Sequence, residues 1–153
     1  MRALERKIPP VVTCLLLGAG MGVTAWLVPA LGFPLPARRP LAAVLAIAGL
    51  VLAVLGVISF RRVGTTIHPL RPEAASHLVV AGIYRRTRNP MYLGMLLVLL
   101  GWAVCLAHPL ALLLAITFVP LMNRLQIGPE EAALAARFGA EFAAYRATVR
   151  RWL

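Results

Sequence analysis

The chain has 153 residues, of which 61% are hydrophobic and 14% charged, and its formal net charge is +11. A soluble domain is usually about 45–50% apolar and about 25% charged, so this composition is typical of a membrane protein. A basic soluble protein would suggest nucleic-acid binding, but here the arginines flank apolar runs and the sequence has no such motif. We therefore predict one all-α integral-membrane domain over residues 1–153 with no nucleic-acid partner.

The first apolar run predicts a membrane helix at residues 10–31. This run is longer than the roughly 7–15 apolar residues of a signal peptide, so we expect the helix to be retained. Gly18 and Gly22 have the G-x-x-x-G spacing that lets helices approach closely in lipid. No strand precedes these glycines, which favours helix packing over phosphate binding. A loop rich in proline then leads to a second predicted helix at residues 41–60.

The third apolar block, Met91–Asn123, is longer than one membrane span requires. Its 33 residues would form a helix of about 50 Å, whereas the hydrocarbon core is about 30 Å thick. Pro109 interrupts the block, which predicts a hairpin of two helices at residues 91–107 and 109–125. We expect Gly128 to end the fourth helix and Pro129 to begin a separate amphipathic helix at the membrane interface.

The distribution of basic residues predicts the orientation of the four spans. Of the 16 lysines and arginines, only Arg38 and Arg39 lie in the loop between the first two helices. Cytoplasmic loops are enriched in lysine and arginine, so we expect both termini and residues 61–89 to be cytoplasmic. The composition, heavy in arginine, alanine and leucine, suggests a bacterium, and the predicted location is the bacterial inner membrane.

Functional candidates are restricted by the scarcity of acidic residues. The five acids all lie outside the predicted spans, which argues against a proton-coupled transporter. The sequence has no H-E-x-x-H zinc motif and no arrangement for nucleophilic catalysis, so we predict no metal site. A polar group nevertheless remains on the cytoplasmic side: His68, Tyr84, Arg88, Asn89, Tyr92, Glu130, Glu131 and Tyr145. These residue types suit a ligand with a carboxylate, an ammonium group, a ribose and an aromatic base.

Two ordered blocks of this group resemble the isoprenylcysteine carboxyl methyltransferase family, which is itself similar to phospholipid N-methyltransferases. The family pattern G-x-Y…R-H-P-x-Y-x-G is matched by Gly82, Tyr84, Arg88, Asn89, Pro90, Tyr92 and Gly94. The pattern E-E-x-x-L…F-G-x-x-[FY]-x-x-Y is matched by Glu130, Glu131, Leu134, Phe138, Gly139, Phe142 and Tyr145. The segment Gly64–Pro69 also resembles the approach loop of that family, so the resemblance covers roughly residues 64–153.

The resemblance implies an S-adenosylmethionine-dependent methyltransferase that acts on a substrate partitioned into the membrane. It implies that the two blocks meet around the cofactor, with Arg88 and Asn89 holding the methionine carboxylate or orienting the acceptor. Glu130 or Glu131 would hold the cofactor's ammonium or ribose, and the catalytic set would be Arg88, Glu130 and Glu131. The pocket would be lined by Tyr84, Tyr92 and Tyr145. Asn89 stands where the family usually has histidine. Asparagine can still make a hydrogen bond at this position, but it cannot carry a charge.

Each of these residues also has a purely structural interpretation. Asn89 followed by Pro90 is a common way to begin a helix, with asparagine as the N-cap. The acids at positions 130 and 131 would favour the N-terminal end of a helix dipole. Tyrosines are enriched at membrane interfaces, and the arginines at positions 85 and 86 suit a simple topology signal.

The sequence is compatible with more than one methyl acceptor. A prenylated carboxylate, a phosphatidylethanolamine headgroup and a small thiol all suit such an enzyme, and a lipid-like substrate would enter from the bilayer. A hypothesis of another class is a non-catalytic scaffold or regulatory subunit, supported by the Asn89 departure. The sequence makes no prediction of the oligomeric state.

Overall fold

The computed structural model describes residues 8–64 and 77–153, and within these ranges the chain is helical and contains no strand. The elements are α1 (Pro10–Leu27), η2 (Pro29–Leu31), α2 (Arg38–Val63), η4 (Gly82–Arg85), α3 (Pro90–Leu106), α4 (Pro109–Met122), η5 (Asn123–Ile127) and α5 (Gly128–Thr148). The predicted all-α class is therefore confirmed for the described part of the chain.

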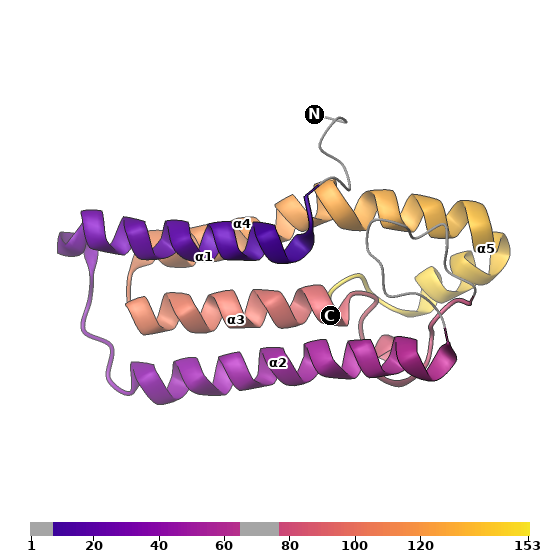
Figure 1. Cartoon of the computed structure of the whole chain (residues 1–153), viewed down its shortest axis with the longest axis horizontal. Coiled ribbons are helices and arrows are strands. Elements are labelled where there is room, and N and C mark those ends of the chain that lie inside the picture. The colour runs from indigo at the N-terminus through magenta and orange to yellow at the C-terminus, as the bar shows by residue number, and fades with distance from the viewer. Residues whose placement is uncertain (1–7, 65–76) are drawn as a thin grey trace.

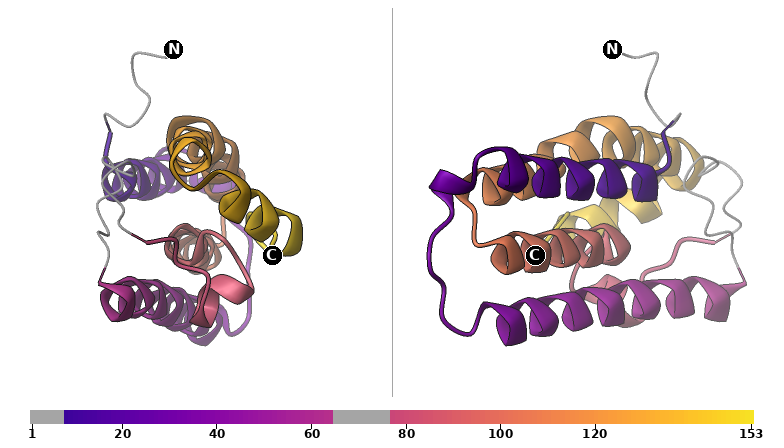
Figure 2. Two further views of the ribbon diagram at one scale, coloured as in Figure 1. Left: turned by 90° about the vertical axis from the view of Figure 1, so that its right-hand side faces the viewer. Right: turned by 60° about the vertical axis from the view of Figure 1, so that its left-hand side comes forward.

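The helices run side by side in a bundle with α3 in its middle (Figures 1 and 2). Helices α1 and α4 lie together on one side of α3, and α2 packs along the other side. A buried cluster that includes Met21, Leu99, Phe118 and Met122 fills the space between α1, α3 and α4. Helix α5 extends beyond the bundle from the end of α4, and the C-terminus returns to lie beside the start of α3 (Figure 1).

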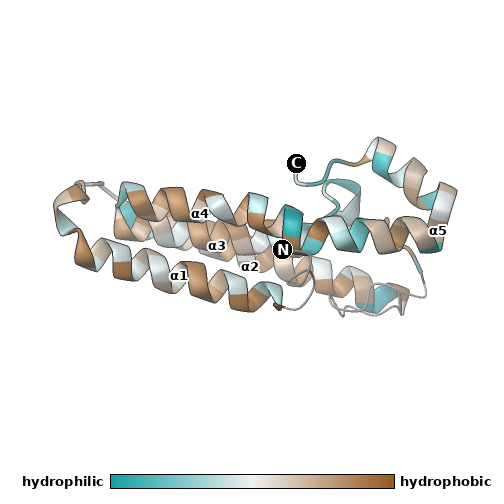
Figure 3. Cartoon of the chain, turned by 90° about the horizontal axis from the view of Figure 1, so that it is seen from above, coloured by the Kyte–Doolittle hydropathy of each residue, from teal (hydrophilic) through white to brown (hydrophobic). Residues whose placement is uncertain are grey.

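Three helical segments of the described chain are long and apolar enough to cross a membrane: Pro10–Leu27, Arg38–Val63 and Pro109–Thr148. Helix α3 is equally apolar but has only 17 residues. Large apolar side chains such as Leu15, Ile47 and Leu113 are exposed on the outside of the bundle. Hydrophobic residues dominate α1 to α4, whereas hydrophilic residues gather around α5 and the C-terminal end (Figure 3). Because an exposed apolar surface of this kind suits lipid, the bundle has the character of an integral membrane protein.

The bounds of the first two helices differ from the prediction. Helix α1 ends at Leu27 rather than residue 31, because Pro29 disfavours helical angles at Val28, whose φ and ψ are −126° and 58°. Helix α2 is longer than the predicted 41–60, since it includes arginines at both ends. The hairpin break before Pro109 is confirmed, with α3 ending at Leu106.

The prediction that Gly128 ends the fourth helix is wrong. Helix α4 continues through the π-helical segment η5 into α5, and Gly128 has helical angles (φ −58°, ψ −54°). A wider π-turn changes the hydrogen-bond ladder, which lets Pro129 follow without ending the helix. The chain instead breaks its helical angles at Gly139 (φ 48°, ψ −117°), eleven residues further along.

Glycines set the closest approach between helices. Gly18 and Gly22 of α1 face α3, where the atoms nearest to an added Cβ belong to the side chains of Leu99 and Trp102, each at 3.8 Å. The tightest approach, however, lies between α2 and α3, where a Cβ at Gly49 would meet the Gly94 carbonyl oxygen at 2.5 Å. Two further glycines lie at opposite ends of the same interface, Gly56 against Pro90 and Met91, and Gly101 against Ala42 and Ala46. The sequence motif therefore identified a real contact but not the tightest one.

Gly49→Ala is expected to lower the melting temperature of the detergent-solubilised protein, whereas Gly18→Ala is expected to change it little. The Gly49 methyl would overlap backbone, which cannot move aside as a side chain does, and overpacking of this kind costs about 1–3 kcal/mol. At Gly18 the nearest atom to an added Cβ is Leu99 Cδ2 at 3.8 Å, an ordinary contact. Thermal unfolding of the two variants, followed by circular dichroism, makes the comparison. A larger effect at Gly18 would contradict the packing described here.

Candidate functional site

The turn at Gly139 folds the end of α5 back toward the bundle. Its angles match the first central residue of a type II′ turn, a position that glycine favours because it requires a positive φ. After this turn Phe142 and Tyr145 are buried, and the Tyr145 hydroxyl donates a hydrogen bond to the Tyr84 carbonyl oxygen at 2.8 Å. The returning half of α5 is thereby fixed to η4, which precedes α3.

Arg88 joins the start of α3 to both ends of α5. Its Nη2 contacts Glu131 Oε1 at 2.8 Å, and both side chains are only 11% exposed. Its Nη1 donates to the carbonyl oxygens of Arg146 and Val149 at 3.1 and 3.0 Å. Its main-chain N–H donates to the Arg150 carbonyl oxygen at 3.0 Å. Arg88 is therefore both a charge partner of Glu131 and a clamp on the end of α5.

Asn89 precedes α3, but its side chain makes no capping hydrogen bond. The side-chain Nδ2 instead donates to the Arg151 carbonyl oxygen at 2.9 Å. The interpretation of Asn89 as only an N-cap is thus wrong, although Pro90 does occupy the first turn of α3 as predicted. An uncharged amide is sufficient for this contact, because its partner is a neutral carbonyl group.

The three tyrosines of the predicted site are buried in the protein. The Tyr92 hydroxyl donates to Glu130 Oε1 at 2.6 Å, which links α3 to the first turn of α5. Burial raises the pKa of the Tyr84 phenol, and the neighbouring Tyr145 and Glu130 raise it further. Tyr84 therefore keeps its proton at neutral pH. Burial of all three rings favours the pocket interpretation over an interfacial belt.

Sequence reasoning missed the segment that follows α5. Arg151 is a second charge partner of Glu131, with Nη2 2.5 Å from Oε2 and Nε 3.1 Å from Oε1. The indole N–H of Trp152 donates to Asn123 Oδ1 at 3.1 Å. In the sequence, Arg151 looks like one more cytoplasmic charge, and only the fold-back at Gly139 brings it to Glu131. His68 and most of the Gly64–Pro69 segment lie outside the described residues.

The structure thus brings the two sequence blocks together at one end of the bundle. Tyr92 meets Glu130, Arg88 meets Glu131, and Tyr84 meets Tyr145. Among the described residues, the buried Nε of Arg88 has no hydrogen-bond partner. Over residues 8–64 and 77–153, no group of three histidine, cysteine or acidic side chains is placed to hold a metal ion.

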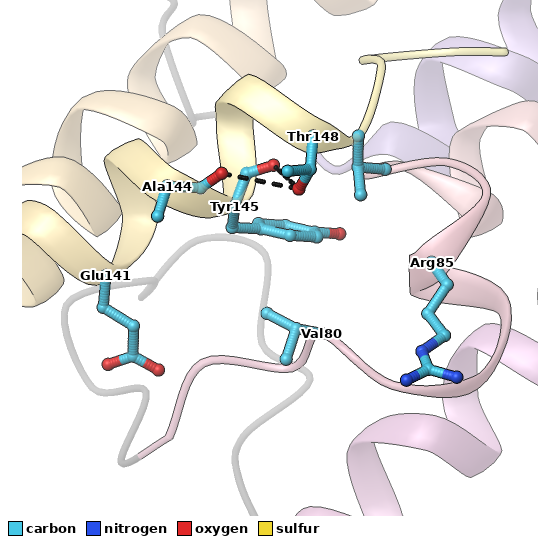
Figure 4. A pocket seen from close by; sticks show the side chains of 7 residues that line it. Val80, Arg85, Glu141, Ala144, Tyr145 and Thr148 are labelled. Atoms are coloured by element: carbon cyan, nitrogen blue, oxygen red, sulfur yellow. Dashed lines mark hydrogen bonds between the residues drawn. The ribbon is translucent and has the colours of Figure 1, made fainter.

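A cavity of about 510 Å³ lies beside this cluster, and the Tyr145 ring forms part of its wall. Figure 4 shows Arg85 and Glu141 on opposite sides of the cavity, with Val80 and the Tyr145 ring between them. The remaining lining residues are Ala144, Thr148 and Val149. Arg85, which was predicted to serve only membrane topology, therefore borders an open space that has a cation on one side and a carboxylate on the other.

Comparison with known proteins agrees with the resemblance seen in the two blocks. The chain is 46% identical over 63 residues to an uncharacterized protein of Haemophilus influenzae, a match that covers 41% of this chain and the whole of that relative. The phospholipid methyltransferase family matches residues 37–141, which include α2, α3, α4 and the Glu130-Glu131 pair. This match covers more than half of the chain and is consistent with its apolar helices. The chain belongs to the phospholipid methyltransferase family.

Proposed function

We propose that the protein is an S-adenosylmethionine-dependent methyltransferase whose acceptor is partitioned into the membrane. The observation that carries the proposal is the meeting of the two sequence blocks, through the Arg88–Glu131 and Tyr92–Glu130 contacts, in a chain of this family. The cluster offers carboxylates, buried tyrosines and a buried guanidinium donor in one place. This set suits a ligand that carries a carboxylate, an ammonium group and a nucleoside.

Bound S-adenosylmethionine supplies an electrophilic methyl group on a sulfonium. Arg88 Nε would donate to the methionine carboxylate, while Glu130 would accept from the ammonium or the ribose. The tyrosines and the surrounding apolar helices would exclude water, which strengthens each of these contacts. The catalytic contribution of the chain is then mainly alignment of the acceptor with the methyl group and sulfur.

The acceptor in this proposal is lipid-like and is an isoprenylcysteine-type carboxylate or a phospholipid amine, with a small thiol as a further alternative. A carboxylate can attack the methyl group without losing a proton. An amine or thiol must first lose a proton, so those acceptors also require a base in the site. The cavity bordered by Arg85 and Glu141 has room for a polar headgroup, and the exposed apolar helices suit a tail that enters from lipid.

The proposal includes the predicted topology of four spans, with α3 as a short one, both termini cytoplasmic and the site on the cytoplasmic side. Arginines at residues 61, 62, 85 and 86 cluster at the end of the bundle that carries the site. Positive charge at one end favours the cytoplasmic side, here of the bacterial inner membrane. A short α3 can be accommodated by local thinning of the bilayer.

A second candidate function is a non-catalytic scaffold or regulatory subunit. The observation that favours it is the saturation of the cluster by its own contacts, since both Nη atoms of Arg88 already have protein partners. In that case the Arg88–Glu131 pair would stabilise the fold without binding a cofactor.

Binding of radiolabelled S-adenosylmethionine to the purified protein separates the two candidates. We expect saturable binding that unlabelled cofactor displaces, both in detergent and in bilayers. Absence of saturable binding in both settings would overturn the enzyme proposal and leave the scaffold. Mass spectrometry of lipid extracts from cells with and without the protein then identifies the acceptor, as a lipid that gains one CH₂ unit.

A further inference from the structure

We propose that Arg151 is a positioning residue of the cofactor site, which holds the Glu131 carboxylate in place so that Glu131 can hold Arg88. The inference rests on the proposed function and adds to it a residue outside the two sequence blocks. It is carried by the geometry of Glu131, whose carboxylate lies between two guanidinium groups.

The Arg151 contact is the more extensive of the two. Its Nε and Nη2 contact the two different carboxylate oxygens of Glu131, at 3.1 and 2.5 Å. Such a two-point contact fixes the rotation of the carboxylate as well as its distance. Arg88 contacts only Oε1, at 2.8 Å. Arg151 therefore determines how Glu131 presents Oε1 to Arg88.

The main chain around Arg151 is held by the start of α3. Its carbonyl oxygen accepts hydrogen bonds from Asn89 Nδ2 at 2.9 Å and from Thr87 Oγ1 at 3.3 Å. The next residue, Trp152, is anchored to Asn123 in η5. The main chain of this segment is thus attached both to the start of α3 and to η5, which keeps the Arg151 side chain, itself 38% exposed, beside Glu131.

The consequence for a ligand follows from Arg88 Nε. This atom is buried and has no hydrogen-bond partner in the part of the chain that the structure describes, so its direction decides where a bound carboxylate would lie. Arg88 is oriented by Glu131 on one side and by two carbonyl oxygens of α5 on the other. Without Arg151, the Glu131 carboxylate can rotate away, and the Arg88 side chain loses one of the three contacts that orient Nε.

The test compares Arg151→Ala and Arg151→Lys with Arg150→Ala, using the affinity for S-adenosylmethionine as the readout. Arg150 is the matched control: its side chain is exposed, it carries the same charge at the same end of the bundle, and its contact with Arg88 uses the main chain. We expect Arg151→Ala to weaken binding about tenfold or more, the loss typical of a charge-assisted hydrogen bond. Arg151→Lys should recover part of the lost affinity, and the affinity of Arg150→Ala should stay within about twofold of the wild-type value.

A double-variant cycle with Glu131→Gln distinguishes positioning from general structural support. If Arg151 acts through Glu131, the double variant should bind no more weakly than Glu131→Gln alone. Additive losses, or wild-type affinity in Arg151→Ala, would overturn the role of Arg151 while leaving the enzyme proposal intact. Absence of binding by the wild type would overturn both. Circular dichroism of each variant confirms that the comparison is made on helical protein.

Discussion

Gly139→Ala is expected to reduce the affinity for S-adenosylmethionine at least about tenfold while leaving the apolar helices folded. The angles of Gly139 suit glycine alone among the common residues, and forcing another residue into them costs about 1–3 kcal/mol. Within residues 8–64 and 77–153 no atom lies within 4 Å of an added Cβ, so the effect comes from the backbone and not from a steric clash. The turn should open, which would carry Tyr145 and the segment after α5 away from Tyr84 and Arg88.

The control for this experiment is Gly20→Ala in α1. That position also has no described atom within 4 Å of an added Cβ, but its backbone is helical, where alanine is favoured. Cofactor binding is measured by radioligand titration and helix content by circular dichroism. Unchanged binding by Gly139→Ala would mean that the turn does not build the site. Loss of helix content in both variants would point to general instability instead.

The apolar core of this fold was predictable because membrane helices are encoded by local sequence. Runs without charge predicted the helices, and Pro109 predicted the hairpin, since a proline interrupts the backbone ladder wherever it occurs. The continuation of α4 through Gly128 was not predictable in the same way. A π-helical segment depends on the packing of η5 against its neighbours, and glycine followed by proline normally favours a helix end.

The residues of the candidate site were predictable only where they belong to one of the two sequence blocks. Arg88, Glu131, Tyr92 and Glu130 stand in two recognisable blocks, and the structure brings these blocks into contact. Arg151 gave no signal, because an arginine after an amphipathic helix is ordinary in a chain with this net charge. Its role depends on a reversal of direction at Gly139, and the sequence shows only a glycine there. Contacts between residues far apart in the sequence, such as Arg151 and Glu131, depend on the path of the backbone and could not be read from the local sequence.

Substitution of Arg88 is expected to have the largest effect on both cofactor binding and thermal stability. Arg88→Ala would leave the Glu131 carboxylate, 11% exposed, with Arg151 alone, and would leave two carbonyl oxygens at the end of α5 without their donor. Removing one partner of a buried ion pair costs about 3–5 kcal/mol when the other charge is left uncompensated, and because Glu131 keeps Arg151 the expected cost here lies below that range. We expect Arg88→Ala to abolish cofactor binding and to lower the melting temperature, whereas Arg86→Ala, at an exposed neighbour of equal charge, should do neither.

Arg88→Lys separates the two roles of this arginine. Lysine keeps the charge and can contact Glu131, but it has no planar fork and no Nε positioned beside the ion pair. We therefore expect the melting temperature to recover in part while cofactor binding stays lost, because the donor assigned to the ligand is Nε. Recovery of binding in step with stability would mean that Arg88 serves only as a clamp. Equal effects of Arg88→Ala and Arg86→Ala would reduce the whole arginine cluster to a signal for membrane topology.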